Sequence, residues 1–508
     1  MKPRKIFYIL VVVVITILPY MAGFLSSGED RVFVGFLVNP YDGNSYLAKM
    51  QLGLRGGWKF HLPYTADSGN GAYLFLFYIF LGHLSRWLGL APITMFHLAR
   101  VLSGVTLFVV LHVFYDTVYG RGNSEAANKA FYLAVVGSGL GWVASFAGML
   151  SPDLWIPEAY PFFSAYATPH FPLGMALLLV TFTISLQELN WLRIVTLVIS
   201  GGLLGVIMPF GVVLTGIVLT VQAVCEAIQS HKIVWLPVFS SLSIGGPLVL
   251  YQYWATLSDP ILAGWNVQNV TPAPKILELV LGFLPVLFVA LWGMVNYRQL
   301  WQNPAIRLLN VWVLTSLVLV YSPFSLQRRF MFALFVPVAG LAVQGLMSAQ
   351  LKKKQKMYVW YALLFLSIPT NVILVLSGLY GIQKQDPRLY LTGHEKAVLE
   401  WVDENTPDDA LILSSPEIGL FIPAQTGRKV LYGHPFETVN AEEEKFFVES
   451  FFAGNLGEED GMRSIKGRGV DFIFYGPREA KLGYPDGLEK MKVVFRQGEV
   501  VLFAVGDQ

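Results

Sequence analysis

Residues 6–25 read IFYILVVVVITILPYMAGFL and contain no charged side chain. An apolar run of about 20 residues is long enough to cross the roughly 30 Å hydrocarbon core of a bilayer as a helix. Lys2, Arg4 and Lys5 precede the run, and basic residues favour the cytoplasmic side of a membrane. No small-residue cleavage site follows it, so we predict an uncleaved first span with the N-terminus in the cytoplasm.

Similar apolar runs recur along most of the chain. Of its 508 residues, 54% are hydrophobic and 14% are charged, whereas a soluble domain has about 25% charged residues. These numbers predict a polytopic α-helical membrane protein. The further predicted spans are residues 95–118, 130–150, 170–187, 194–208, 212–229, 233–254, 276–296, 308–321, 330–349 and 357–380. With the first span, this gives about eleven transmembrane helices.

Basic residues between the predicted spans set the orientation. Those assigned to the cytoplasmic side are Arg121, Lys129, Arg193, Lys232, Arg298, Arg307 and the lysines of LKKKQK at 351–356. This positive-inside pattern holds only if the apolar segment 71–90 does not span. His83, Arg86 and the glycines of the segment favour a half-embedded interfacial helix there. We therefore predict a multi-pass protein of the cell membrane with a cytoplasmic N-terminus and an extracytoplasmic C-terminus.

Composition changes sharply near residue 381, where long apolar runs end and charge becomes frequent. The stretch TGHEKAVLEWVDENTP is an amphipathic helix, with Thr392 as a candidate N-cap and Glu395 three residues later. Short β-like runs follow, namely ALILS, KVLYG, VDFIFYG, KVVFRQ and EVVLFAV, with the helical stretch AEEEKFFVESFFAG between them. We predict a transmembrane domain at 1–380 and a small extracytoplasmic α/β domain at 381–508.

This topology leaves several polar loops on the outer face. The first loop, 26–94, is too long for a simple connector, and long loops tend to carry function. The first loop carries Asp42 and Tyr46, a second carries Asp153, Glu158 and His170, and another carries Arg328 and Arg329. Carboxylates and an arginine pair at the edge of a bilayer indicate chemistry on a lipid-linked anionic substrate.

Three stretches carry a resemblance: NPYDGNSYLAKMQLGLRGGW in the first loop, TPHFPLG at 168–174, and LQRRFMFALFVPVAG at 326–340. Over roughly residues 1–350 the plan resembles membrane glycosyltransferases of the GT-C superfold, such as protein O-mannosyltransferases and aminoarabinose transferases. Many relatives have two adjacent acids in the first loop, whereas here Gly43 follows Asp42. The second acidic loop lacks a D-x-D pair, which weakens a metal-dependent mechanism like that of the oligosaccharyltransferases.

The resemblance implies a polyprenyl-phosphate-linked sugar as donor and transfer to an acceptor hydroxyl with inversion. Asp42 then fits the general base. Arg328 and Arg329 fit the donor phosphate, because guanidinium groups stay charged and offer paired donors. His170, at the outer start of a span, fits the same phosphate. Asp153, Glu158 and Tyr46 are the candidates for contact with the sugar or the acceptor.

Each of these residues also has a purely structural interpretation. Asp42 lies in strong turn chemistry, with Asn44 or Ser45 available to cap the following helix. The arginines are also placed to snorkel at the interface, and two adjacent ones on one helix are not expected to face the same way. Asp153 and Glu158 are also compatible with solvated loop charges. His434 and Glu437 of GHPFET are too isolated for a metal site, so a buried structural contact is predicted.

No cofactor and no metal ligands are predicted, and a need for a divalent metal stays open. The predicted partners are the lipid-linked sugar, the bilayer and a glycan, lipid or protein acceptor of the cell envelope. A nucleic-acid partner is not predicted because the chain has no basic cluster of the kind that nucleic-acid binding needs. Two other functions stay open: a transporter or flippase of a lipid-linked glycan, and a catalytically inactive scaffold. Transporters carry ionisable groups near the bilayer midplane, whereas the acids here lie in outer loops.

Overall fold

The computed structural model describes residues 3–231 and 234–506, so Lys2 and Lys232 lie outside the described residues. The chain divides into two compact units. The helical unit consists of Met1–Leu18, His97–Tyr251 and Thr271–Gly378, and the mixed unit consists of Pro19–Phe96, Gln252–Val270 and Leu379–Gln508. The predicted boundary at residue 380 stays a prediction, since the unit that contains the tail also contains residues 19–96 and 252–270.

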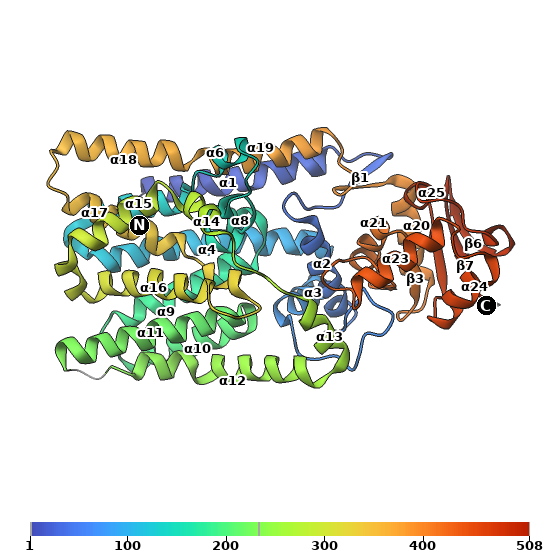
Figure 1. Ribbon diagram of the computed structural model, residues 1–508, viewed down its shortest axis with the longest axis horizontal. Helices are drawn as coiled ribbons and strands as arrows, with labels where there is room; N and C mark the ends of the chain where they lie inside the picture. The colour runs from blue at the N-terminus through green and yellow to red at the C-terminus, as the bar shows by residue number, and fades with distance from the viewer. Residues whose placement is uncertain (1–2, 232–233, 507–508) are drawn as a thin grey trace. The chain divides into compact units, whose positions relative to one another are not determined.

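The apolar part of the chain is helical throughout, as the ribbon shows (Figure 1). Its long helices are α1 (Pro3–Leu25), α4 (Pro92–Tyr119), α5 (Ser124–Val136), α9 (His170–Ser185), α10 (Trp191–Ile207), α11 (Pro209–Ser230), α12 (Leu236–Ser258), α14 (Ile276–Phe283), α15 (Val286–Asn296), α16 (Pro304–Val320), α17 (Phe335–Ser348), α18 (Lys353–Ser367) and α19 (Pro369–Gln383). The short helices α6 (Gly141–Phe146), α7 (Pro152–Trp155), α8 (Pro161–Ala167) and the 3-10 turns η2 (Pro157–Ala159) and η4 (Gln327–Met331) lie between them.

Each predicted span coincides largely with one of these helices or helix pairs. Within the described residues, six helices are long and apolar enough to cross a membrane, or up to seven when the bent pair α14–α15 counts as one span. The chain is therefore a multi-pass membrane protein. Helices α9, α10 and α16 are apolar but shorter, with 16, 17 and 17 residues. At 1.5 Å per residue, 16 residues extend over about 24 Å, less than the hydrocarbon core. The count of eleven crossings thus stays a prediction.

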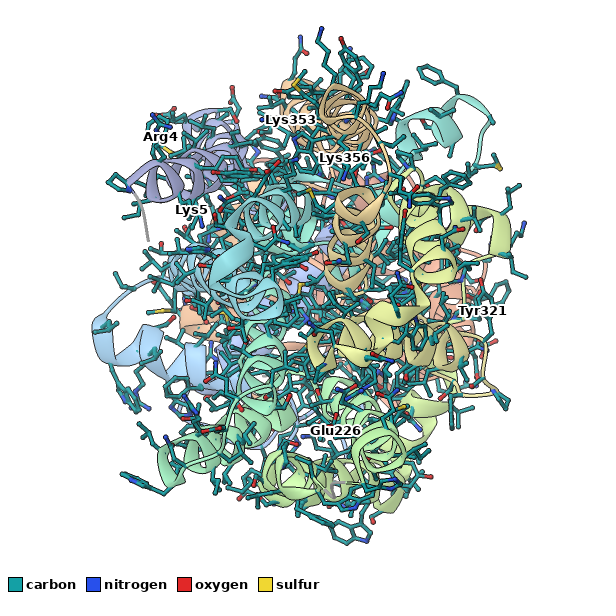
Figure 2. The ribbon with its side chains drawn as sticks, turned by 90° about the vertical axis from the view of Figure 1, so that its left-hand side faces the viewer. Arg4, Lys5, Glu226, Tyr321, Lys353 and Lys356 are labelled. Atoms are coloured by element: carbon teal, nitrogen blue, oxygen red, sulfur yellow. The ribbon has the colours of Figure 1, made fainter. Side chains whose placement is uncertain are left out.

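Basic residues gather at one end of the helical unit. Figure 2 shows Arg4 and Lys5 of α1 and Lys353 and Lys356 of α18 on the same face. Lys5 Nζ also lies 3.1 Å from His112 Nδ1 on α4. Two segments that were predicted to face the cytoplasm, the one around Arg4 and the lysine run at 351–356, therefore lie on the same side of this unit, as a shared membrane side requires.

The first loop contributes two helices to the mixed unit, α2 (Pro40–Leu54) and α3 (Leu76–Leu88). They pack closely because glycines face backbone at two points. A Cβ on Gly53 would lie 1.9 Å from the Ile79 carbonyl oxygen, and one on Gly82 would lie 2.0 Å from that of Met50. Helix α3 has 13 residues and is not among the candidate spans of the described chain. This agrees with the prediction that segment 71–90 does not cross the membrane.

Helix α2 begins earlier than predicted. Its N-cap is Asn39, whose side chain accepts a hydrogen bond from the Asp42 backbone N–H, and Pro40 occupies the first helical position. The prediction that Asn44 or Ser45 caps the helix was wrong, since both lie inside it and are buried. Asn39 has φ 42°, a left-handed conformation that asparagine tolerates better than most residues. The NPYDGN stretch is therefore the first turn of a helix.

The tail contains strands at the five short β-like runs of its sequence. Strands β3 (Leu411–Leu413), β4 (Lys429–Val430), β5 (Phe472–Tyr475), β6 (Lys492–Gln497) and β7 (Val500–Ala504) correspond to the five predicted runs. They form one mixed sheet in the order β4-β3-β5-β7-β6, parallel among β4, β3 and β5 and antiparallel on either side of β7. Its helices are α20 (Gly393–Asn405), α21 (Pro416–Gly419), α22 (Phe421–Thr426), α23 (Ala441–Phe452), α24 (Glu458–Gly467) and α25 (Pro477–Ala480).

Two local features tie the tail together and to the first loop. The capping box of α20 is confirmed, with Glu395 N–H donating to Thr392 Oγ1 at 3.1 Å and Thr392 N–H donating to Glu395 Oε2 at 2.8 Å. Strand β1 (Arg31–Phe33) pairs antiparallel with β2 (Tyr390–Thr392). Helix α13 (Pro260–Gln268) completes the mixed unit, which is thus assembled from three separate stretches of sequence.

Candidate functional site

Asp42 is the third residue of α2, at the end where the helix dipole stabilises negative charge. Asn39 Nδ2 donates a hydrogen bond to Asp42 Oδ2 at 2.6 Å. The Asp42 side chain is 42% exposed, whereas the next three residues of the helix are buried. The predicted base is therefore an oriented carboxylate that solvent, or a substrate, can reach.

His434 of the tail approaches the other oxygen of this carboxylate. His434 Nε2 lies 3.9 Å from Asp42 Oδ1, and the side chain is 2% exposed. His434 Nδ1 accepts hydrogen bonds from the backbone N–H groups of Phe436 at 3.1 Å and Glu437 at 3.2 Å. Burial lowers the pKa of His434, although Glu437 and Asp42 act in the opposite direction. The ring is thus neutral at pH 7, and with Nδ1 accepting, the proton is on Nε2.

Lys49 is fully buried one helical turn beyond Ser45. Its Nζ donates to Glu437 Oε1 at 2.6 Å and to Ser45 Oγ at 2.5 Å, and Ser45 Oγ donates to the same carboxylate oxygen at 2.5 Å. The ammonium also lies 4.5 Å from the centre of the Phe75 ring. Burial alone would raise the pKa of Glu437, but Lys49 and His434 outweigh it and the net shift is downward. Lys49 and Glu437 thus form a buried ion pair.

Tyr46, predicted to contact the sugar or the acceptor, lies on the same helix. Its ring stacks on Tyr78 of α3 with 4.3 Å between ring centres and 7° between planes. Tyr41 lies on the other side of Asp42 in sequence, with its ring centre 6.0 Å from that of His434. Two tyrosines that flank Asp42 on α2 are therefore each held against another ring.

In the helical unit, the structure brings three predicted residues together. Arg329 donates to Glu158 Oε1 at 2.9 Å, and Arg328 Nε lies 3.9 Å from the same oxygen. The Arg328 guanidinium also covers the Trp155 ring at 4.7 Å. Both arginines lie on the 3-10 turn η4 and approach the same oxygen of Glu158, so the expectation that the two do not face the same way was wrong. Because Glu158 is buried, it is not a solvated loop charge, and it fixes the position of the arginine pair.

The other two predicted residues of this unit have distinct environments. His170 is the first residue of α9, as predicted, and its ring packs on Phe171 with 4.0 Å between centres. Asp153 is buried, and its Oδ2 accepts from the backbone N–H groups of Gly139 and Gly141 at 3.1 and 2.9 Å. Ser151 donates to Asp153 Oδ1 at 2.6 Å. Asp153 therefore holds the turn before α6.

The sequence predicted the buried contact of His434 and Glu437 but not their lysine partner. The prediction that His434 and Glu437 make a buried polar contact is confirmed. Lys49 was missed as their partner, although a lysine between Leu47 and Met50 on an amphipathic helix was the available signal. Within residues 3–231 and 234–506, no group of three or more His, Cys, Asp or Glu side chains is placed to hold a metal ion.

Comparisons with known proteins identify the fold. No family model matches the sequence, and no curated protein matches it either. Among solved structures, the chain is similar to the oligosaccharyltransferase of Archaeoglobus fulgidus tethered with an acceptor peptide, with TM-score 0.54 and 13% identity over 94% of this chain and 69% of that one. It is also similar to arabinofuranosyltransferase AftD from mycobacteria, with TM-score 0.53 and 14% identity over 100% of this chain and 40% of that one. The chain thus has the fold of the GT-C superfold glycosyltransferases.

Proposed function

We propose that this protein is a GT-C-type glycosyltransferase that moves a sugar from a polyprenyl-phosphate donor to an acceptor hydroxyl. The observation that carries the proposal is the half-exposed, oriented carboxylate of Asp42 in a chain of this fold. The two solved structures of similar fold are named as transferases of sugars. The acceptor is a glycan, lipid or protein of the cell envelope.

The proposed reaction inverts the anomeric configuration. The acceptor oxygen attacks the anomeric carbon on the face opposite the phosphate, and its proton passes to Asp42 as the new bond forms. The bond from that carbon to the phosphate oxygen breaks, and its electron pair leaves with the polyprenyl phosphate. Arg328 and Arg329, oriented by Glu158, stabilise the growing negative charge on the leaving oxygen. His170 is assigned to the same phosphate and Tyr46 to the sugar or the acceptor, whereas Asp153 is buried in the turn before α6 and Glu158 orients the arginines.

The proposed setting is the outer face of the cell membrane. We assign eleven crossings, counting α9, α10, α12 and α16 with the longer spans. The basic residues of α1 and α18 at one end of the helical unit support a cytoplasmic N-terminus. An odd number of crossings then places residues 381–508 outside, where a lipid-linked sugar and an envelope acceptor meet.

Replacing Arg329 by glutamine is expected to weaken binding of undecaprenyl phosphate by about tenfold to a hundredfold, the effect of losing one hydrogen bond to a charged group. The measurement is a titration of the purified full-length protein in detergent. Because the single change also leaves the buried Glu158 without its closest cation, it is paired with Arg329→Gln/Glu158→Gln. Weak binding in both variants supports a phosphate ligand, and recovery in the double variant contradicts it. Arg4→Gln, at an exposed position near the N-terminus, is the control.

Mass spectrometry of lipid-linked sugars and surface glycans, with and without the protein, tests the function as a whole. Loss of the enzyme is expected to leave a single polyprenyl-phosphate sugar unused and one envelope glycan shorter by that sugar. A flippase would instead leave a complete lipid-linked glycan unexported. Unchanged lipid and glycan profiles would indicate the inactive scaffold and reject the proposed transferase.

A further inference from the structure

Where the tail contacts α2, two buried polar atoms are unsatisfied in their hydrogen bonding. Among the described residues, His434 Nε2 and Glu437 Oε2 are buried and have no hydrogen-bond partner. Leaving a buried polar group unpaired costs roughly 1–3 kcal/mol, so such atoms in a native fold call for an explanation. The His434 atom carries a proton and lies 3.9 Å from Asp42 Oδ1, the oxygen that Asn39 does not hold.

His434 is held in one orientation from several directions. Its ring Nδ1 is occupied by the two backbone donors at 436 and 437, and its own backbone N–H donates to Thr438 Oγ1 at 3.3 Å. The rings of Tyr64 and Tyr41 lie 5.6 and 6.0 Å from the imidazole. The ring therefore has little freedom to turn, and its Nε2 is held 3.9 Å from Asp42 Oδ1 in the first turn of α2.

We propose that His434 is a positioning residue for Asp42, holding one carboxylate oxygen through Nε2–H while Asn39 holds the other. This inference rests on the proposed function and deepens it, because it makes the tail a working part of the transferase. His434 is too deeply buried to touch an acceptor, whereas Asp42 is half-exposed. Closing the gap from 3.9 Å to a hydrogen bond of about 2.9 Å needs a shift of about 1 Å, and such contacts commonly tighten when substrate binds.

The buried ion pair behind the ring supports this assignment. Lys49 and Glu437 form an ion pair, so their charges largely cancel at the His434 ring. The neutral ring can then act as a hydrogen-bond donor to the Asp42 carboxylate. The charged and titratable groups around His434 are Asp42, Lys49 and Glu437, with Tyr41 and Tyr64 against the ring. A neutral hydrogen-bond donor stabilises the carboxylate but does not give it a proton. The carboxylate therefore stays able to accept the proton of the acceptor hydroxyl.

Two amide substitutions separate the positioning role from a purely structural one. The amide of asparagine reaches the place of Nδ1, so His434→Asn keeps an acceptor for the turn and loses the donor toward Asp42. The longer His434→Gln places an N–H near the position of Nε2. Transfer by His434→Asn is expected to fall about tenfold to a hundredfold, and His434→Gln is expected to recover most of it. The readout is the glycan product defined by the mass spectrometry above, and the exposed His394→Asn is the matched control.

A second measurement needs no substrate. Full-length protein with ¹⁵N-labelled histidine is compared in detergent as wild type, Asp42→Asn and Asp30→Asn, with the His434 signal assigned by its absence in the glutamine variant. The His434 Nε2 resonance is expected to shift in Asp42→Asn and not in Asp30→Asn. An unshifted resonance, or wild-type transfer by His434→Asn, overturns the positioning role and leaves the transferase standing. Wild-type transfer by Asp42→Asn instead overturns the proposed function, and this inference with it.

Discussion

Replacing Asp42 by asparagine is expected to lower sugar transfer by about 10²–10⁴-fold, the contribution of a positioned general base. Asparagine keeps the size and the first-turn position of the side chain but cannot accept the hydroxyl proton. The donor is bound by the proposed arginine pair, so the affinity for undecaprenyl phosphate is expected to stay unchanged. The measurement pairs the glycan product with a binding titration of the same purified protein.

The matched control for this change is Asp30→Asn, since Asp30 lies in the same loop and is exposed. Transfer at the wild-type level is expected from that variant. Equal losses in both variants would mean that the loop needs negative charge in general, and would remove the specific role of Asp42. A loss of donor affinity in Asp42→Asn would place this residue in binding and not in proton transfer.

Replacing Lys49 by methionine is expected to destabilise the protein by about 3–5 kcal/mol, the usual cost of removing one member of a buried ion pair. The side chain of Lys49 is 1% exposed and that of Glu437 12%, so water cannot compensate the remaining carboxylate. Methionine fills a similar volume among Phe60, Phe75 and Tyr46, which isolates the effect of charge. Denaturant unfolding of the purified protein, followed by tryptophan fluorescence, is the measurement.

Lys49→Met/Glu437→Leu is expected to regain much of that stability, because an apolar pair often replaces a buried ion pair at little cost. An equal loss in the single and double variants would show that packing and not charge is responsible. The exposed pair Lys445 and Glu449 on α23 provides the comparison. Lys445→Met is expected to change the free energy of unfolding by no more than about 0.5 kcal/mol.

Much of the fold could be predicted from local patterns. The five strands of the tail lie at the short β-like runs, and the capping box at Thr392 and Glu395 marks the start of α20. The start of α2 was misplaced because NPYDGNS offers several cap residues in a row, and only the left-handed backbone of Asn39 selects one of them. Apolar length also predicted the long helices, yet three of these helices are too short for length alone to decide whether they cross the membrane.

The sequence predicted those residues of the candidate site that lie within short stretches, but not the contacts between distant residues. Asp42 stands out because it lies in NPYDGNSYLAKMQLGLRGGW, which carries the family resemblance, and the adjacent arginines stand out because an apolar span follows them. The partnership of Lys49 with Glu437 joins residues 388 positions apart, and the approach of His434 to Asp42 is similarly distant. No periodicity or spacing encodes such a pairing, because it depends on how the tail packs on the first loop. Glu158, a sequence candidate for the sugar or the acceptor, likewise contacts Arg329 across 171 positions of sequence.

The three-segment origin of the mixed unit has a consequence for biosynthesis. Residues 19–96 leave the ribosome early, whereas their partners in the tail begin at residue 379. At 5–20 residues per second, translation separates them by roughly 15–60 s. During that interval α2 carries an ammonium group whose counter-charge does not yet exist. The nascent first loop must therefore remain hydrated and incompletely folded until nearly the whole polypeptide has been synthesised.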